Sequence, residues 1–125
     1  MLVVLEYVDV PTDRATQTFH RVAGTGASGY SGDGGPARSA TLAGPKGLAI
    51  GSDNALYVAD TENHVVRRID LRTEVITTVL GTGTRGDGPE PEPRLCQLSR
   101  PHGVLVADGA LYVSDSEAHR IRIVR

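Results

Sequence analysis

An internal repeat constrains this sequence more than any other feature. The stretch 42–70 recurs as 98–125, and Pro45 returns as Pro101, 56 residues later. Other matched positions lie 55 to 57 residues apart, so the two copies differ only by small length changes in loops. A repeat of this length forms one unit of supersecondary structure that buries its apolar face only by stacking on a neighbour.

Each copy has the pattern of four short strands joined by turns. Alternating apolar residues and a high content of Val, Ile and Thr indicate strands that are half-buried in a sheet. In the first copy we predict strands at Lys46–Ile50, Ala55–Ala59, His64–Ile69 and Val75–Leu80. Long loops follow the fourth strands, and short helical turns are expected there at Ala37–Thr41 and Arg94–Gln97.

Four antiparallel strands repeated with long connections predict an all-β fold of the β-propeller type, with a β-sandwich as the alternative. The net charge of −2 with scattered basic residues gives no reason to expect nucleic acid as a partner. One cysteine excludes an internal disulfide framework and a cysteine-based zinc cluster. Neither a membrane-length apolar run nor a signal peptide is present, so we expect a soluble chain of unknown compartment without a membrane partner.

The motifs V-A-G-T-G, S-G-D-G-G-P-A, P-K-G-L-A-I and L-Y-V-A-D-T-E-N-H-V-V-R-R-I-D follow one another between Val22 and Asp70. In this order they resemble a blade of an NHL-repeat propeller. The second copy, 79–125, resembles it less well, because Asn63-His64-Val65 is replaced by Ala118-His119-Arg120. The resemblance implies the fold but says little about function, because one fold hosts many functions.

The length of the chain does not suit a closed propeller. Propellers close with 4 to 8 blades, whereas 125 residues at 56 per blade give about 2.2 blades. We divide the chain into the outer strands of a partial blade (1–24), a first blade with a long leading loop (25–80), and a second blade lacking its outermost strand (81–125).

We therefore expect either a piece of a longer chain or a chain that assembles with copies of itself. Three copies with two blades each would give a six-bladed ring, so a homotrimer is favoured. In that ring the strand 17–22, with Phe19 and Val22, would complete a neighbour's second blade. One strand would then be redundant, either Val3–Val8 or His119–Val124, and we expect His119–Val124 to stay in its blade.

Lys46 and His102 are the candidate binding residues. Each lies between the proline and the glycine that open the innermost strand of a blade. In a trimer they would alternate around the mouth of the central channel, three of each. Such a ring suits a small anion, or a metal ion held by three His nitrogens. The alternative is that both are solvated loop side chains.

Two Asp–His pairs, Asp60 with His64 and Asp115 with His119, occupy the same place in both copies. They suit a metal site or an acid–base pair. The structural interpretation is a hairpin in which the carboxylate caps loop amides and the His holds the neighbouring segment. The repetition favours structure, because one active site needs only one copy, and we assign no metal ligands.

Several weaker motifs are explained more simply by structure. The G-x-G-x-x-G of residues 24–29 is not followed by a helix, so its glycines are expected to supply turns with positive φ and not to bind a nucleotide. The glycine-flanked Asp33 and Asp87 lack the remaining residues of a calcium loop. Cys96 aligns with Ala40 and is expected to be a packing residue. A solvated or inter-chain face is expected for Arg120, Arg122 and Arg125.

The sequence shows no catalytic constellation and no cofactor motif. The leading interpretation is a non-enzymatic propeller module that self-assembles and binds a protein or small anion through its loops and channel. The alternative is part of a metal-dependent hydrolase or lyase with its site at the channel mouth. A third interpretation is that the chain assembles without any ligand of its own.

Overall fold

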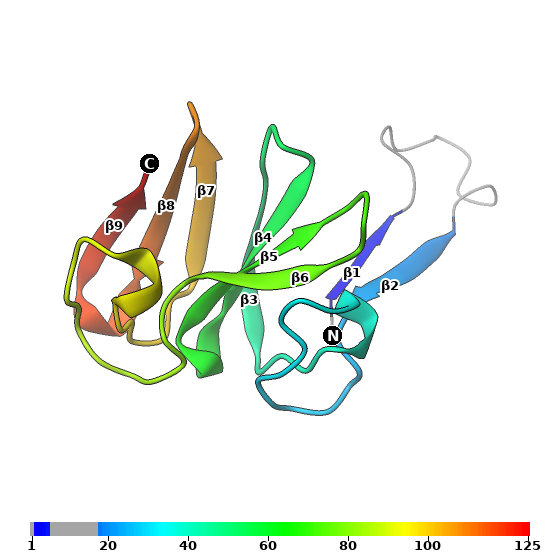
Figure 1. The fold of residues 1–125 in the computed structure, drawn as a ribbon, viewed down its shortest axis with the longest axis horizontal. Helices are drawn as coiled ribbons and strands as arrows, with labels where there is room; N and C mark the ends of the chain where they lie inside the picture. Colours follow the sequence, from blue (N-terminus) through cyan, green and yellow to red (C-terminus); the bar gives the residue numbers. More distant parts are fainter. Residues whose placement is uncertain (1, 6–17) are drawn as a thin grey trace.

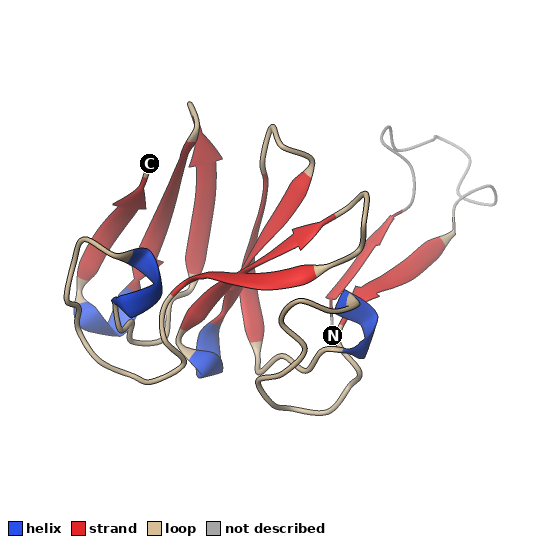
Figure 2. Cartoon of the chain, viewed as in Figure 1, coloured by secondary structure: helices blue, strands red, loops and turns tan. Residues whose placement is uncertain are grey.

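A computed structural model describes residues 2–5 and 18–125 of the chain. Their strands form three antiparallel sheets that stand side by side (Figures 1 and 2). The first contains β1 (Leu2–Leu5) and β2 (Phe19–Ala23). The second contains β3 (Pro45–Ile50), β4 (Ala55–Asp60), β5 (Val65–Asp70) and β6 (Ile76–Leu80). The third contains β7 (Gly103–Ala107), β8 (Ala110–Asp115) and β9 (Arg120–Val124).

This arrangement confirms the all-β class, and the described sheets contain two, four and three strands. Short 3₁₀ turns lie in the long loops and in the hairpins that precede β5 and β9: η2 (Ala37–Ser39), η3 (Thr61–Asn63), η4 (Pro93–Leu95) and η5 (Ser116–Ala118). The predicted N-terminal strand Val3–Val8 extends beyond β1 into residues 6–17, which lie outside the described residues.

The first sheet pairs in the register of the outer half of a blade. Leu5 of β1 lies opposite Phe19 of β2, as Ile69 of β5 lies opposite Ile76 of β6. The register also shifts at equivalent positions, between Leu2 and Val3 of β1 and between Val66 and Arg67 of β5. By backbone pairing, β1 and β2 are therefore equivalent to the third and fourth strands of a blade.

Apolar side chains fill the spaces between adjacent sheets. One buried cluster lies between β2 and the four-stranded sheet: Ala23, Ala37, Ala40, Leu42, Leu56, Val58, Ile69 and Ile76. A second lies between the four-stranded and three-stranded sheets: Val66, Leu80, Cys96, Leu98, Leu111 and Val113. Cys96 and Ala40 hold corresponding places in the two clusters, which confirms that Cys96 is a packing residue. Burial also raises the pKa of the Cys96 thiol.

The first strands of the two blades, β3 and β7, pack against each other. Gly47 makes this approach possible, because a Cβ added there would overlap the carbonyl oxygen of His102. The repeat places Gly103 at the matching position of the three-stranded blade. The backbones of β3 and of the residue before β7 therefore lie in close contact at this point.

Candidate functional site

Lys46 and His102 lie at the start of neighbouring inner strands. Lys46 is exposed in β3, and His102 is half-buried immediately before β7. The Nδ1 of His102 donates to the carbonyl oxygen of Arg100 at 2.8 Å. This bond leaves Nε2 as the ring atom that can coordinate a metal ion through its lone pair or, in the imidazolium form, donate to an anion. No hydrogen bond or ion pair joins Lys46 to His102 within the described residues, so a shared channel site stays a prediction.

Asp60 is fully buried at the end of β4 and accepts several hydrogen bonds. Its Oδ1 accepts from the backbone N–H of Ala43 at 2.8 Å. Its Oδ2 accepts from Asn63 Nδ2 at 2.9 Å and from Arg67 Nη1 at 3.0 Å. The carboxylate thus joins the loop before β3 to the hairpin between β4 and β5.

Arg67 is the cation in this network, and its side chain is fully buried. Its Nη2 also pairs with Asp33 at 3.0 Å, and its guanidinium lies 5.0 Å from the ring centroid of Tyr30. Asp33 in turn accepts from the hydroxyl of Thr78 on β6 at 2.5 Å. Asp33, in the glycine-rich loop, therefore serves as an ion-pair partner that anchors its loop to β5 and β6.

The three-stranded blade repeats the network around Asp115. Its Oδ1 accepts from the backbone N–H of Ser99 at 2.7 Å, and its Oδ2 accepts from Arg122 Nε at 2.8 Å. Arg122 also pairs with Asp87 at 2.6 Å and with Glu90 at 2.5 Å. The expectation of a solvated or inter-chain face is wrong for Arg122, because its guanidinium is buried between carboxylates of its own blade. Arg120 is exposed, as expected, and pairs with Asp87.

The two histidines of the repeated pairs have different surroundings. The Nδ1 of His64 accepts from the backbone N–H of Arg100 at 3.1 Å, which links the first blade to the second. His119 has the same backbone conformation but is exposed, and no described residue forms a hydrogen bond with its ring. Neither histidine hydrogen-bonds to the Asp of its pair within the described part of the chain. The structure therefore places them as separate groups.

An exposed ion network spans the two blades beside His64. Arg100 binds Glu62 of η3 at 2.8 Å and also contacts Glu117 of η5, which pairs with Arg85 at 2.6 Å. Hydrogen bonds from Arg100 lower the pKa of both glutamates. Because these pairs are solvent-exposed, they contribute little stability individually.

The partial burial of His64, together with the charge of Arg85, lowers its pKa below 6.5. The unfolded chain takes up a proton near pH 6.5, whereas the folded chain does so only at lower pH. We therefore expect the free energy of unfolding to decrease as the pH falls below 6.5. Urea denaturation monitored by circular dichroism from about pH 8 to about pH 5 measures this decrease. It should shrink in His64→Ala and persist in His119→Ala; an equal decrease in wild type and His64→Ala would contradict the prediction.

The glycine motifs have the conformation expected of turns. Gly24 and Gly26, which follow β2, have φ values of 90° and 98°. Gly81 and Gly83, which follow β6, have φ values of 100° and 94°. No helix begins directly after either pair. This confirms that the glycines supply positive φ after the outer strand of a blade.

Two negative findings concern residues 2–5 and 18–125 only. Within these ranges, no three His, Cys, Asp or Glu side chains come together to form a group able to hold a metal ion. No helix in the same ranges has both the length and the apolar character needed to span a membrane.

Four-stranded antiparallel sheets, stacked side by side with their first strands in close contact, define blades of a β-propeller. The chain belongs to the NHL-repeat family. The model of the Teneurin NHL domain matches residues 16–101, more than half of the chain, and the NHL repeat model matches residues 98–124. These matches confirm the family that the repeat motifs indicated.

Curated relatives share parts of this sequence. NHL repeat-containing protein 2 of Gallus gallus is 57% identical over 42 residues, which cover 34% of this chain and 6% of that protein. Teneurin-1 of Mus musculus is 32% identical over 139 aligned residues, which cover 92% of this chain and 5% of the relative. The chain thus spans about one twentieth of the length of these relatives.

Solved structures share the fold at low sequence identity. A Bacteroides thetaiotaomicron protein of unknown function superposes with a TM-score of 0.75 at 18% identity, covering 86% of this chain and 27% of that one. An auxiliary nutrient binding protein from the same organism superposes with a TM-score of 0.71 at 22% identity, covering 86% and 28%. These two similarities show the fold alone.

Proposed function

We propose that this chain is a non-enzymatic binding module that assembles with copies of itself into a closed propeller. A ring of three chains would have six blades and would present its loops and central channel to a protein or a small anion. The observation that carries the proposal is a pair of exposed apolar faces, one on the side of each blade that is turned away from the other blade. The equivalent faces between the two blades are covered, because the blades pack against each other there.

The outer face of the three-stranded blade exposes side chains at positions that are buried in the other blade. Ile121 of β9 is 74% exposed, whereas Val66, at the same position of β5, is fully buried against the second blade. Leu105 and Tyr112 extend the exposed face across β7 and β8. Burial of such side chains is a main source of association free energy.

The four-stranded blade also has an uncovered face along its first strand, on the side turned away from the three-stranded blade. Leu48 and Ile50 of β3 are 45% and 60% exposed. Their counterparts Val104 and Val106 of β7 are half-buried and pack against the core between the blades. A second copy that places its β7 side against this β3 would repeat the packing already present within the chain. Such head-to-tail contacts form rings when the rotation closes.

The edge of the three-stranded blade has room for a fourth strand. A groove of about 460 Å³ runs along β9, and its lining includes Leu80, Cys96 and Val124. The corresponding residues of the other cluster, Ala23, Ala40 and Ile69, surround Ile76 of β6. In β2 the residue equivalent to Ile76 is Phe19, which is 73% exposed. We propose that β2 of a second copy lies in this groove, with Phe19 in the place of Ile76.

Light scattering after size-exclusion chromatography tests the assembly. A trimer has a mass of about 40 kDa, three times the 13.2 kDa of one chain. Ile121→Lys should shift the mass to that of a monomer and keep the β-sheet circular dichroism signal. Leu95→Lys is the matched control, because Leu95 is exposed on η4, at the position of exposed Ser39, and is neither on the strands of the two faces nor in the lining of the groove along β9. A wild-type mass of 13.2 kDa at all concentrations would overturn the proposal.

The channel site has its own test. If His102 and Lys46 bind a small anion, titration calorimetry with inorganic phosphate should show saturable binding to the wild-type assembly and clearly weaker binding to His102→Ala. Arg72→Ala, at an exposed position in the turn between β5 and β6, controls for a general loss of positive charge. Equal heats for wild type and His102→Ala would remove anion binding from the proposed function and leave the assembly intact.

A further inference from the structure

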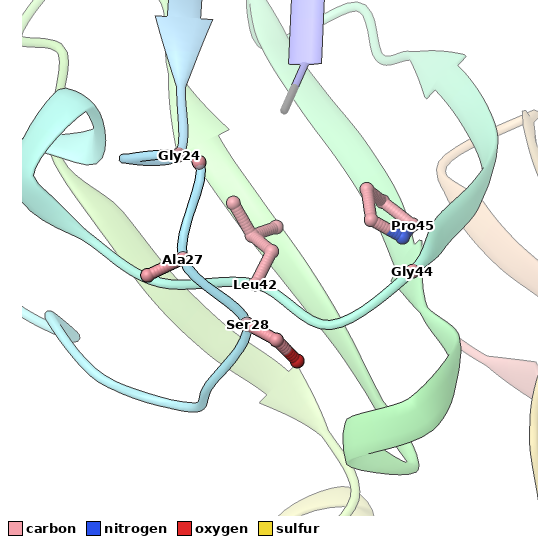
Figure 3. A pocket seen from close by; sticks show the side chains of 7 residues that line it. Gly24, Ala27, Ser28, Leu42, Gly44 and Pro45 are labelled. Atoms are coloured by element: carbon pink, nitrogen blue, oxygen red, sulfur yellow. The ribbon is translucent and has the colours of Figure 1, made fainter.

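A small pocket lies where the loop after β2 meets the start of β3. It measures about 140 Å³ and is lined by Gly24, Gly26, Ala27, Ser28, Leu42, Gly44 and Pro45 (Figure 3). Pockets for small-molecule ligands usually measure about 300–1,000 Å³. This pocket has room for one side chain, and its glycines leave their backbone accessible.

The same location in the second repeat is filled by the first blade. There, a Cβ added at Gly81 would meet the carbonyl oxygen of His64 at 2.6 Å, so the backbone of His64 passes directly over this glycine. The backbone N–H of Arg100 donates to His64 Nδ1 at 3.1 Å. The hydroxyl of Thr61 donates to the carbonyl oxygen of Pro101 at 2.6 Å. These contacts form a socket between successive blades.

The pocket of the first repeat is built from the equivalents of these residues. Gly24 has the positive φ of Gly81, 90° against 100°. Gly44 has the left-handed conformation of Arg100, with φ values of 61° and 47°. Their backbones therefore take similar conformations. Pro45 completes the correspondence, because it takes the place of Pro101.

The side chains that would fill this pocket are present in the second blade. His119 has φ 57° and ψ 41°, against 58° and 39° for His64, so η5 ends in the same conformation as η3. Ser116 takes the place of Thr61 and also carries a hydroxyl group. His119 is exposed, and no hydrogen bond joins its ring to the described part of the chain. One chain thus carries both this pocket and, in its second blade, the side chains whose equivalents fill the matching location of the second repeat.

We propose that His119 of one copy occupies this pocket of a second copy. Its Nδ1 would accept from the backbone N–H of Gly44, and the Ser116 hydroxyl would donate to the carbonyl oxygen of Pro45. This inference rests on the proposed head-to-tail assembly. Both place the second blade of one copy against the first blade of the next. Both polar contacts already exist once within the chain, between its two blades.

The test compares His119→Ala with wild type by sedimentation velocity and by ¹⁵N–¹H correlation spectra. His119→Ala should weaken association roughly five- to tenfold for each contact, the effect expected for a lost hydrogen bond. The amide resonance of Gly44 should shift with concentration in the wild type and not in His119→Ala. His64→Ala is the matched control: it should lower the folding stability and retain the concentration-dependent shift of Gly44.

Two outcomes separate the socket from the assembly. If the wild type assembles and His119→Ala leaves both the association constant and the Gly44 shift unchanged, His119 does not occupy the pocket of a second copy. The proposal of head-to-tail assembly is then retained. If the wild type remains a monomer and the Gly44 amide never shifts, both proposals are wrong.

Discussion

Asp60→Ala is expected to destabilise the fold by about 3–5 kcal/mol, the usual cost of removing one partner from a buried ion pair. The substitution leaves the fully buried Arg67 with Asp33 as its remaining carboxylate partner. It also deprives the backbone N–H of Ala43 of its acceptor. Because small domains have only about 5–15 kcal/mol of net stability, the variant should unfold at a much lower urea concentration.

Asp53→Ala is the control for this prediction. Asp53 also binds an arginine, Arg68, at 3.1 Å, but both side chains are partly exposed. Its removal should cost at most about 1 kcal/mol. If the two variants lose similar stability, the buried pair of Asp60 and Arg67 contributes no more to the free energy of unfolding than an exposed pair does.

Gly47→Ala should be the second most damaging change, at about 1–3 kcal/mol, because the added Cβ would overlap the carbonyl oxygen of His102. A backbone oxygen cannot turn away as a side chain can, so β3 and β7 would have to separate. Urea denaturation measures the cost, and amide hydrogen exchange should show faster exchange in both strands.

Two other glycines are its controls. At Gly35 the nearest atom to an added Cβ is a carbonyl oxygen at 3.4 Å, so Gly35→Ala should change stability by less than about 1 kcal/mol. At Gly103 the nearest atom is the Ser114 hydroxyl at 3.2 Å, so Gly103→Ala should also fold. In the proposed ring, however, Gly103 faces the next copy as Gly47 faces His102, so Gly103→Ala should lower the assembled mass. A large loss of stability in Gly35→Ala would contradict the steric explanation for Gly47.

The strands of the complete blade could be predicted from sequence to within about one residue. β5 and β6 are rich in Val, Ile and Thr, a turn with Asp53-Asn54 follows β3, and Gly81 follows β6, so local pattern and tertiary structure agree. The family could be predicted as well, because its motifs recur in order. The inter-blade role of the main-chain N–H of Arg100 could not, because a backbone donor carries no sequence signal.

The burial of two arginines, Arg67 and Arg122, was not predicted from the sequence. The alternation of β9 suggested a solvated or inter-chain face for Arg122, and no expectation was attached to Arg67, because a pattern of polarity cannot show that a loop covers a side chain. One signal was present: each follows an aspartate by seven residues, Asp60 and Asp115, in both repeats. A charge pair repeated at constant spacing within apolar strands indicates a buried ion pair.

The matching registers of β1–β2 and β5–β6 have a consequence for kinetics. The edge of β2 that β9 of another copy would occupy already holds β1, and it accommodates one strand at a time. Joining two copies through β2 is therefore an exchange, in which one ladder of backbone hydrogen bonds opens as another closes. Release of β1 precedes the encounter, so the assembly rate should stop increasing with protein concentration once that release becomes limiting.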